Sequence, residues 1–155
     1  MALGSYAGSY SYSHHKGEIY SFNSFGWTDT PDYPYGVWTT SDYFYDFSIV
    51  YITEHSAYYV IGGLSDGDKM SQIGKYSDGA WSDAGQLNNG RRGAEAQWLG
   101  SSLIVAGGTS SLSAEPTEKC TLDGANMFTC TDITPTLDGW SYFVSFLIPE
   151  KDQFC

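Results

Sequence analysis

Apolar residues along this chain fall in short runs that are typical of β-strands and not of helices. No stretch of a dozen residues repeats apolar positions at the 3.6-residue spacing of a helix, and Gly, Ser, Asp or Asn interrupts nearly every candidate. Runs rich in β-branched and aromatic residues, bounded by turn formers, predict strands instead. These predicted strands are 17–22, 47–52, 57–61, 71–76, 102–106 and 142–148. The pattern therefore predicts an all-β fold.

An internal repeat is the most informative feature of the sequence. One apolar run ends in Gly62 and Gly63 and another ends in Gly107 and Gly108, so the two glycine pairs lie 107 − 62 = 45 positions apart. Glycine lets the backbone leave a buried strand at positive φ, where a Cβ would clash. Self-similarity at a fixed period of this length indicates repeated sheet units.

Further residues follow in order between the two glycine pairs. Tyr76 and Trp81 flank a turn, Leu87 follows them, and the polar stretch 88–93 contains an Arg-x-Gly step. This succession resembles one complete kelch repeat, the family whose repeats fold as four-stranded blades of a β-propeller. The resemblance implies that Tyr76 and Trp81 fill the space between neighbouring blades.

The resemblance covers most of residues 16–155 and implies about three four-stranded antiparallel blades. Their expected boundaries are 16–63, 64–108 and 109–155, after a Tyr/Gly/Ser-rich N-terminal arm at 1–15. The arm is expected to be either an edge strand or a flexible polar segment. Trp27, in the first expected blade, is predicted to belong to the core.

The expected number of blades is too small to close a ring. Propellers close with about 4–8 blades, and at roughly 45–50 residues per blade this chain supplies about three. We therefore expect a partial kelch-like propeller that is completed by other copies, by a partner or by further chain. An open wedge, or a sandwich of different topology, is the alternative.

The C-terminal part carries all three cysteines. Cys120 and Cys130 lie on either side of the natural hairpin turn 123–126, so paired strands would bring them to the separation that a disulfide needs. Such a bridge implies an oxidising, extracellular compartment; two buried free thiols are the alternative. Cys155 is left over. The segments 117–124 and 146–155 also resemble the last blades of secreted kelch-type proteins from invertebrate animals.

Charge and hydropathy exclude two classes of partner. Seven Lys and Arg against eighteen Asp and Glu give a net charge of −11, which argues against electrostatic binding to nucleic acid. No apolar stretch approaches the roughly 20 residues of a membrane span. The N-terminus shows no signal peptide, so a secreted protein would carry its signal outside this sequence.

Few residues point to catalysis or to cofactor binding. The three histidines, His14, His15 and His55, lack the paired spacing of a zinc site, and no cofactor or phosphate motif is present. The Asp-Gly pairs at 66–67 and 78–79 are better explained as hairpin turns than as calcium ligands. We predict no catalytic residue, no metal and no cofactor.

Three residues are candidates for binding. By the resemblance, Arg91 or Arg92 would grip a carboxylate of a partner, whereas an internal pair with an acidic residue is the alternative. Trp38 lies in an aromatic stretch that would stack on a sugar or a protein. The chain is thus expected to be a non-catalytic extracellular module for protein association or self-assembly. Glycan binding, or a fragment of a propeller enzyme, is the alternative.

Overall fold

A computed structural model of the chain describes residues 3–5, 17–21, 26–34, 44–109 and 115–133. These residues form strands, turns and a single 3₁₀ turn, η1 (Thr53–His55). The predicted all-β fold is therefore confirmed. In the same ranges, no helix has the length and apolar character needed to cross a membrane.

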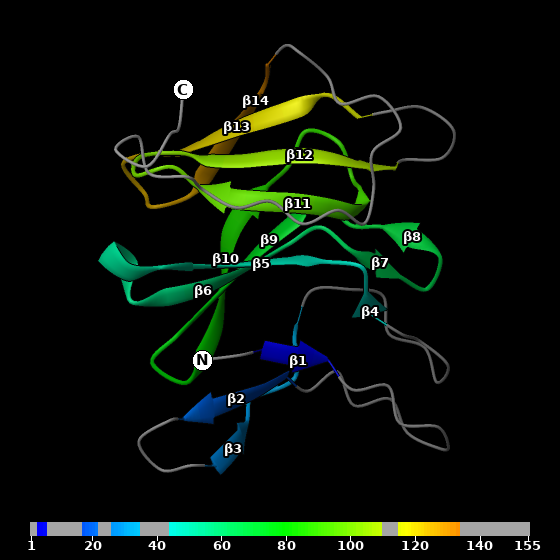
Figure 1. Ribbon diagram of the computed structural model, residues 1–155. Coiled ribbons are helices and arrows are strands. Elements are labelled where there is room, and N and C mark those ends of the chain that lie inside the picture. The colour runs from blue at the N-terminus through cyan, green and yellow to red at the C-terminus, as the bar shows by residue number, and fades with distance from the viewer. Residues whose placement is uncertain (1–2, 6–16, 22–25, 35–43, 110–114, 134–155) are drawn as a thin grey trace, which may run out of the picture.

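The strands form three sheets (Figure 1). The largest contains eight strands in the order β11-β12-β13-β14-β10-β9-β6-β5. Its members are β5 (Ser48–Ile52), β6 (Ala57–Ile61), β9 (Gln72–Ser77), β10 (Ala80–Gln86), β11 (Arg92–Trp98), β12 (Leu103–Thr109), β13 (Thr117–Leu122) and β14 (Phe128–Ile133). The two smaller sheets contain β1 (Leu3–Ser5), β2 (Gly17–Ser21) and β3 (Gly26–Asp29), and β4 (Phe44–Tyr45), β7 (Leu64–Ser65) and β8 (Asp68–Lys69).

The eight-stranded sheet consists of two four-stranded antiparallel meanders. The first meander is β5-β6-β9-β10 and the second is β11-β12-β13-β14, each paired in chain order. They join where β10 runs parallel to β14 over two residue pairs. At the other end of the order, the amide of Ala96 in β11 donates to the Ser48 hydroxyl in β5 at 3.0 Å. The sheet therefore almost closes on itself like a barrel.

The hydrophobic core lies between the two meanders. Each meander contributes the side chains of one face, and these alternate along the strands with residues of the other face. The core residues are Val50, Ile52, Ala57, Tyr59, Ile61, Ile73, Ala84 and Leu87 from the first meander and the strand end that follows it, and Ala96, Leu103, Val105, Cys120, Phe128 and Cys130 from the second. Because each face is covered by the other meander, the two units bury together an apolar surface that neither could bury alone.

The 45-residue repeat of the sequence matches the repeat of the structure. The glycine pairs end or follow the second strand of each meander, and Gly62 and Gly107 have nearly the same φ, 63° and 65°. Gly63 and Gly108 also have positive φ, 108° and 84°. A Cβ on Gly62 would lie 2.7 Å from the carbonyl oxygen of Arg91, so an adjoining backbone leaves no room for a side chain there.

The sheet units have different boundaries from those expected. The second and third predicted units, 64–108 and 109–155, begin after a glycine pair, but hydrogen bonding places the strands before and after each pair in one meander. The meanders therefore span 48–86 and 92–133, while β2 and β3 belong to a separate small sheet. Five of the six predicted strands are present, and the sixth, 142–148, lies outside the described residues. In the N-terminal arm, Leu3–Ser5 forms a strand that pairs with β2.

Candidate functional site

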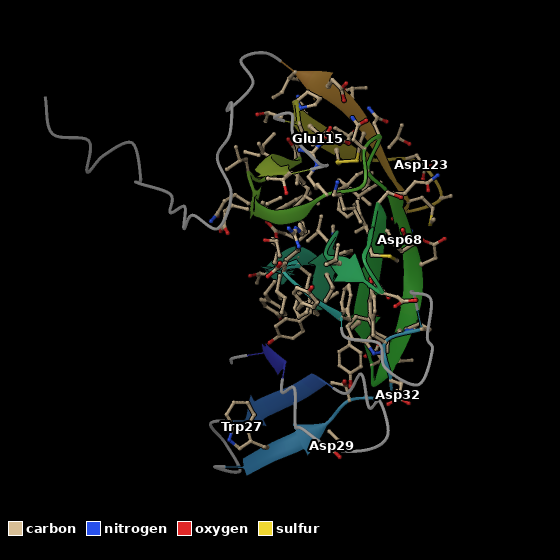
Figure 2. All side chains as sticks on the ribbon, turned by 90° about the vertical axis from the view of Figure 1, so that its right-hand side faces the viewer. Trp27, Asp29, Asp32, Asp68, Glu115 and Asp123 are labelled. Carbon is tan, nitrogen blue, oxygen red and sulfur yellow. A yellow bond between two sulfur atoms is a disulfide. The ribbon has the colours of Figure 1, made fainter. Side chains whose placement is uncertain are left out.

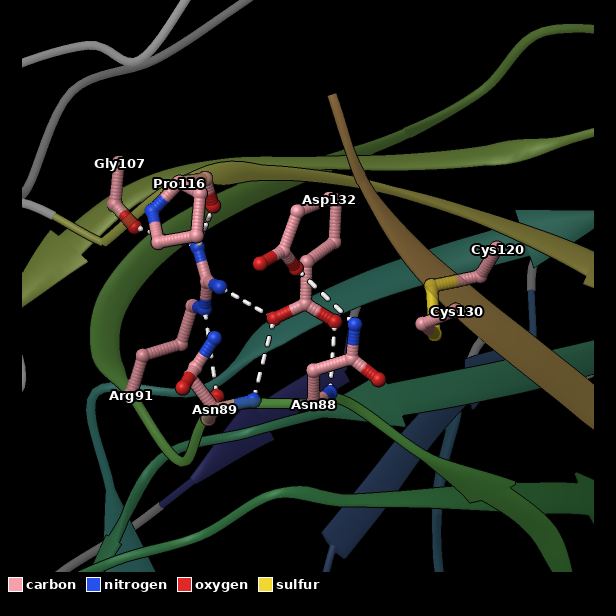
Figure 3. A network of polar contacts seen from close by, with 9 residues as sticks. Asn88, Asn89, Arg91, Gly107, Pro116, Cys120, Cys130 and Asp132 are labelled. Carbon is pink, nitrogen blue, oxygen red and sulfur yellow. Dashed lines mark hydrogen bonds and ion pairs between the residues drawn. A yellow bond between two sulfur atoms is a disulfide. The ribbon is translucent and has the colours of Figure 1, made fainter. Parts of the chain in front are cut away.

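Arg91 is an internal residue. Its side chain is completely buried, and Nη2 donates to the carboxylate of Glu118, which is also completely buried. Nη1 donates to the carbonyl oxygens of Gly107 at 3.1 Å and Pro116 at 2.8 Å, and Nε donates to that of Asn89 at 3.4 Å (Figure 3). An external carboxylate would have to replace these partners, so the binding role predicted for Arg91 is not retained.

The Glu118 carboxylate also holds the linker between the two meanders. Its oxygens accept hydrogen bonds from the backbone amides of Asn88 at 2.7 Å and Asn89 at 3.2 Å. The side-chain amide of Asn88 then donates to Asp132 at 2.9 Å (Figure 3). Buried charges are tolerated when they are both paired and hydrogen-bonded. The structure therefore contains the internal ion pair that was the alternative for Arg91, and its acidic partner is Glu118.

The other two predicted binding residues do not join Arg91 in a site. Arg92 begins β11 and is partly buried, and its Nε is buried without a hydrogen-bond partner among the described residues. Trp38 lies outside those residues. The part of the chain that the structure describes therefore does not assemble the three into one surface.

Tyr76 and Trp81, which the resemblance places between neighbouring blades, do not lie between the two meanders. They face each other across the β9-β10 hairpin, with ring centroids 5.0 Å apart. The Trp81 indole donates to the carbonyl oxygen of Pro31 at 2.9 Å, and the Tyr33 ring meets it edge-on at 4.9 Å. The pair therefore packs against the segment before the first meander, on the face that is turned away from the core.

Trp27 lies outside the core, so the prediction that it is a core residue was wrong. It was expected in the core, but 55% of its surface is exposed, in the separate sheet formed by β1, β2 and β3 (Figure 2). The other residues of its strand are also largely exposed. None of the four residues of β3 is buried, so this strand does not belong to the core.

The predicted disulfide is confirmed. Cys120 and Cys130 are directly opposite in the β13-β14 register and are bonded to each other (Figure 3). Glu118 lies close to both sulfur atoms, within the 4.8 Å that a shared metal ion would require. Both sulfurs are used in the disulfide, so the oxidised protein offers no thiolate ligand there.

An open groove of about 420 Å³ lies over β5 and β11, which contact each other. The first wall consists of residues of β5 and of η1 behind it, including Tyr51 and Glu54. The second wall consists of β11 residues, including Glu95, Gln97 and Trp98. Two carboxylates and two aromatic rings therefore line the hollow that sequence reasoning did not predict.

An aromatic cluster lies next to this groove. The Nδ1 atom of His55 is 2.9 Å from the Tyr59 hydroxyl, and the His55 ring also meets the ring of Trp98 at 5.5 Å. Burial raises the pKa of Tyr59 above its ordinary value. The phenol therefore stays protonated near neutral pH and acts as a hydrogen-bonding group rather than as a base. His14 and His15 lie outside the described residues.

Comparisons with known proteins give information about the fold of the chain and none about its chemistry. No protein-family model and no curated protein matches the chain. Among solved structures, the chain is similar to one titled "Structure of YjhT", with a TM-score of 0.55 and 14% sequence identity. The match covers 76% of this chain and 37% of that one, so this chain spans well under half of that protein. At this identity the likeness shows a shared all-β fold alone.

Proposed function

We propose that the chain is a non-catalytic, extracellular module built from kelch-like propeller blades, and that it mediates protein association. The observation that carries the proposal is the pair of four-stranded meanders that stack face to face with a 45-residue period. Their equivalent glycines, Gly62 and Gly107, have matching backbone conformations. The kelch-like order of Tyr76 and Trp81 on the outer hairpin of the first meander supports the same interpretation.

The need for a neighbour supports a role in association. A propeller blade packs on both faces, and rings close with about 4–8 blades, whereas the described strands make two blade-like units. Further chain, other copies or a partner would supply the remaining contacts. Tyr45, in the small sheet beside the first meander, is 42% exposed. Exposed aromatic side chains of this kind are enriched at protein interfaces.

The outer face of the second meander is polar, in contrast to the aromatic surface beside the first meander. The face opposite the core carries exposed Lys119 and Thr131 as one register pair, and exposed Thr121 and Thr129 as another. Polar pairs of this kind are compatible with water. Association is therefore proposed for the aromatic side of the module, next to the first meander.

The disulfide supports an extracellular location. Disulfides persist in oxidising compartments and are rare in the cytosol. The bridge between Cys120 and Cys130 ties the last two strands of the second meander, β13 and β14, together. It therefore belongs to the framework of the sheet, where a secreted module would benefit from it.

Native mass spectrometry together with sedimentation tests the association. We expect masses above the 17.0 kDa of one chain, with a smaller assembled fraction for Tyr45→Ser. Thr129→Ser, on the polar face of the second meander, is the matched control and should assemble like the natural sequence. A chain that stays at 17.0 kDa at every concentration contradicts assembly from its own copies.

Glycan binding is a second candidate, favoured by one observation. Trp27 presents an exposed indole of the kind that stacks on sugar rings (Figure 2). A glycan array and tryptophan fluorescence test this candidate. A sugar that binds the natural chain and is lost in Trp27→Ala would favour it over protein association.

A further inference from the structure

The linker between the two meanders consists of residues 87–91, which follow the end of β10 and precede the start of β11. Every backbone amide of this linker except that of Gly90 donates a hydrogen bond to a described residue. The donors are Leu87, to the Ser71 carbonyl, Asn88 and Asn89, to the Glu118 carboxylate, and Arg91, to the Met70 carbonyl. Among the described residues, the Gly90 nitrogen is therefore the one linker amide that no hydrogen bond holds.

The side-chain amide of Asn89 also has no hydrogen-bond partner in the described ranges. The hydrogen bonds of this residue with Glu118 and Arg91 use its backbone nitrogen and oxygen (Figure 3). By contrast, the side-chain amide of Asn88 donates to Asp132 at 2.9 Å. Asn89 is partly exposed, so water reaches it. An unrestrained carboxamide thus stands next in the chain to a backbone nitrogen that makes no hydrogen bond.

The fold requires glycine after this asparagine. A Cβ at position 90 would lie 2.5 Å from the carbonyl oxygen of Lys69, so the adjoining backbone leaves no room for a side chain. Glycine has no Cβ that would shield its own nitrogen from the preceding side chain. Packing at Gly90 therefore preserves an Asn-Gly pair, in which the side-chain carbon of Asn89 is open to attack by the next nitrogen.

We propose that Asn89 is a site of spontaneous deamidation, with the backbone nitrogen of Gly90 as the nucleophile. Hydroxide removes the proton of the Gly90 amide, and the nitrogen then forms a bond to Cγ of Asn89. The bond between Cγ and Nδ2 breaks, and Nδ2 takes a proton from water and leaves as ammonia. Water opens the resulting cyclic imide at either of its carbonyls, which yields aspartate or isoaspartate. The reaction consumes only water and involves no oxidation or reduction, as is typical of labile asparagines.

The products act on the ion pair that joins the meanders. Both place a new carboxylate on the residue whose amide donates to the Glu118 carboxylate at 3.2 Å. Like charges at this separation repel, and Glu118 is completely buried beside Arg91. In isoaspartate the main chain also runs through the former side chain, so the linker becomes longer by a methylene group. Deamidation should therefore loosen the attachment of the two meanders irreversibly and as a function of time.

Peptide mapping by mass spectrometry tests the site. The full chain is kept folded at physiological temperature, at neutral and at mildly alkaline pH, and its peptides are followed over several weeks. Asn89 should gain the mass difference between an amide and an acid, at a rate that rises with hydroxide concentration. Asn88, whose side chain is hydrogen-bonded, and Asn126, which precedes Met127, should remain amides over the same period. Retention of the amide at Asn89, or equal conversion of all these asparagines, overturns the inference.

The unfolded chain shows whether the fold permits the reaction. In urea the Asn-Gly pair is free to react, and the folded chain should convert nearly as fast, because no hydrogen bond holds either reacting group. Conversion that occurs only in urea would show that the fold protects Asn89 and would overturn the inference. Asn89→Gln should stay unmodified in both conditions, since its longer side chain would have to close a larger ring.

Two variants with the same change of charge test the consequence. Asn89→Asp reproduces the aspartate product and should lower the midpoint of urea denaturation. Asn126→Asp adds a carboxylate in an exposed turn, where a φ of 60° suits aspartate, and should leave the midpoint unchanged. The natural chain should show the same decrease as isoaspartate accumulates in it. Equal midpoints for the two variants would overturn the effect on the ion pair.

Discussion

Arg91 and Glu118 form a buried ion pair between the linker and β13, although 27 positions separate them in the chain. The guanidinium also donates hydrogen bonds to the carbonyl oxygens of Gly107 and Pro116. The carboxylate accepts hydrogen bonds from two backbone amides of the linker between the meanders. The pair thus fixes where the first meander ends and how the second begins.

Removal of one charge should destabilise the fold strongly. Arg91→Met leaves the Glu118 carboxylate buried without its cation, and breaking a pair of this kind costs about 3–5 kcal/mol. Urea denaturation measures the loss. The neighbouring Arg92→Met removes the same charge from a partly buried side chain and should cost less than about 1 kcal/mol. Similar losses for both variants would contradict the importance of the pair.

Loss of the disulfide should lower stability by a smaller amount. Cys120→Ala/Cys130→Ala opens a loop of about 11 residues, for which the chain-entropy relation gives about 2–3 kcal/mol. Thermal denaturation with and without reductant provides the measurement. Reductant should lower the melting temperature of the natural chain and leave that of the double variant unchanged.

The glycine pairs should tolerate no side chain. Gly62→Ala places a Cβ 2.7 Å from the Arg91 carbonyl oxygen at a φ of +63°, and the left-handed conformation alone costs about 1–2 kcal/mol. Gly108→Ala meets the carbonyl oxygen of Arg92 at 2.9 Å and should behave in the same way. Gly124→Ala, where a Cβ has open space, should stay within about 0.5 kcal/mol of the natural chain. Equal tolerance at all three positions would contradict the packing described.

Alkaline pH should weaken the core through Tyr59. Because burial raises the pKa of this phenol in the folded state, the unfolded chain loses its proton first as pH rises past its ordinary pKa of about 10. The stabilisation is therefore complete below that pH and is lost as pH rises through the folded-state pKa. Urea denaturation at a series of alkaline pH values should show the decline, and Tyr59→Phe should flatten it.

The sequence predicted local features of the sheet well. The Tyr76–Trp81 hairpin and the Cys120–Cys130 bridge each depend on a short turn with alternating neighbours, which a single sequence reveals. β11 was not predicted because Arg92 and Gly93 at its start, directly after the polar residues 88–91, look like part of a loop. The two-residue alternation of Ala94, Ala96 and Trp98, all packed on the core, was the signal available for it.

Sequence patterns could not predict which distant segments of the chain contact each other. Glu118 lies in a strand, and no local spacing connects it with Arg91. The groove arises because β5 and β11, the first strands of two separate meanders, lie side by side. Trp27 was misplaced in the core for the same reason, since burial of an aromatic residue depends on whether another sheet covers it.

Arg91 has one further consequence, because it belongs to both halves of the molecule. Its backbone oxygen accepts from the Gly63 amide at 2.9 Å and its own amide donates to the Met70 carbonyl at 3.1 Å, while its side chain reaches Glu118. Repeat arrays often lose their units one by one from an end. If either meander unfolded alone, Arg91 or Glu118 would remain buried without its charged partner. Both meanders should therefore unfold in a single cooperative transition.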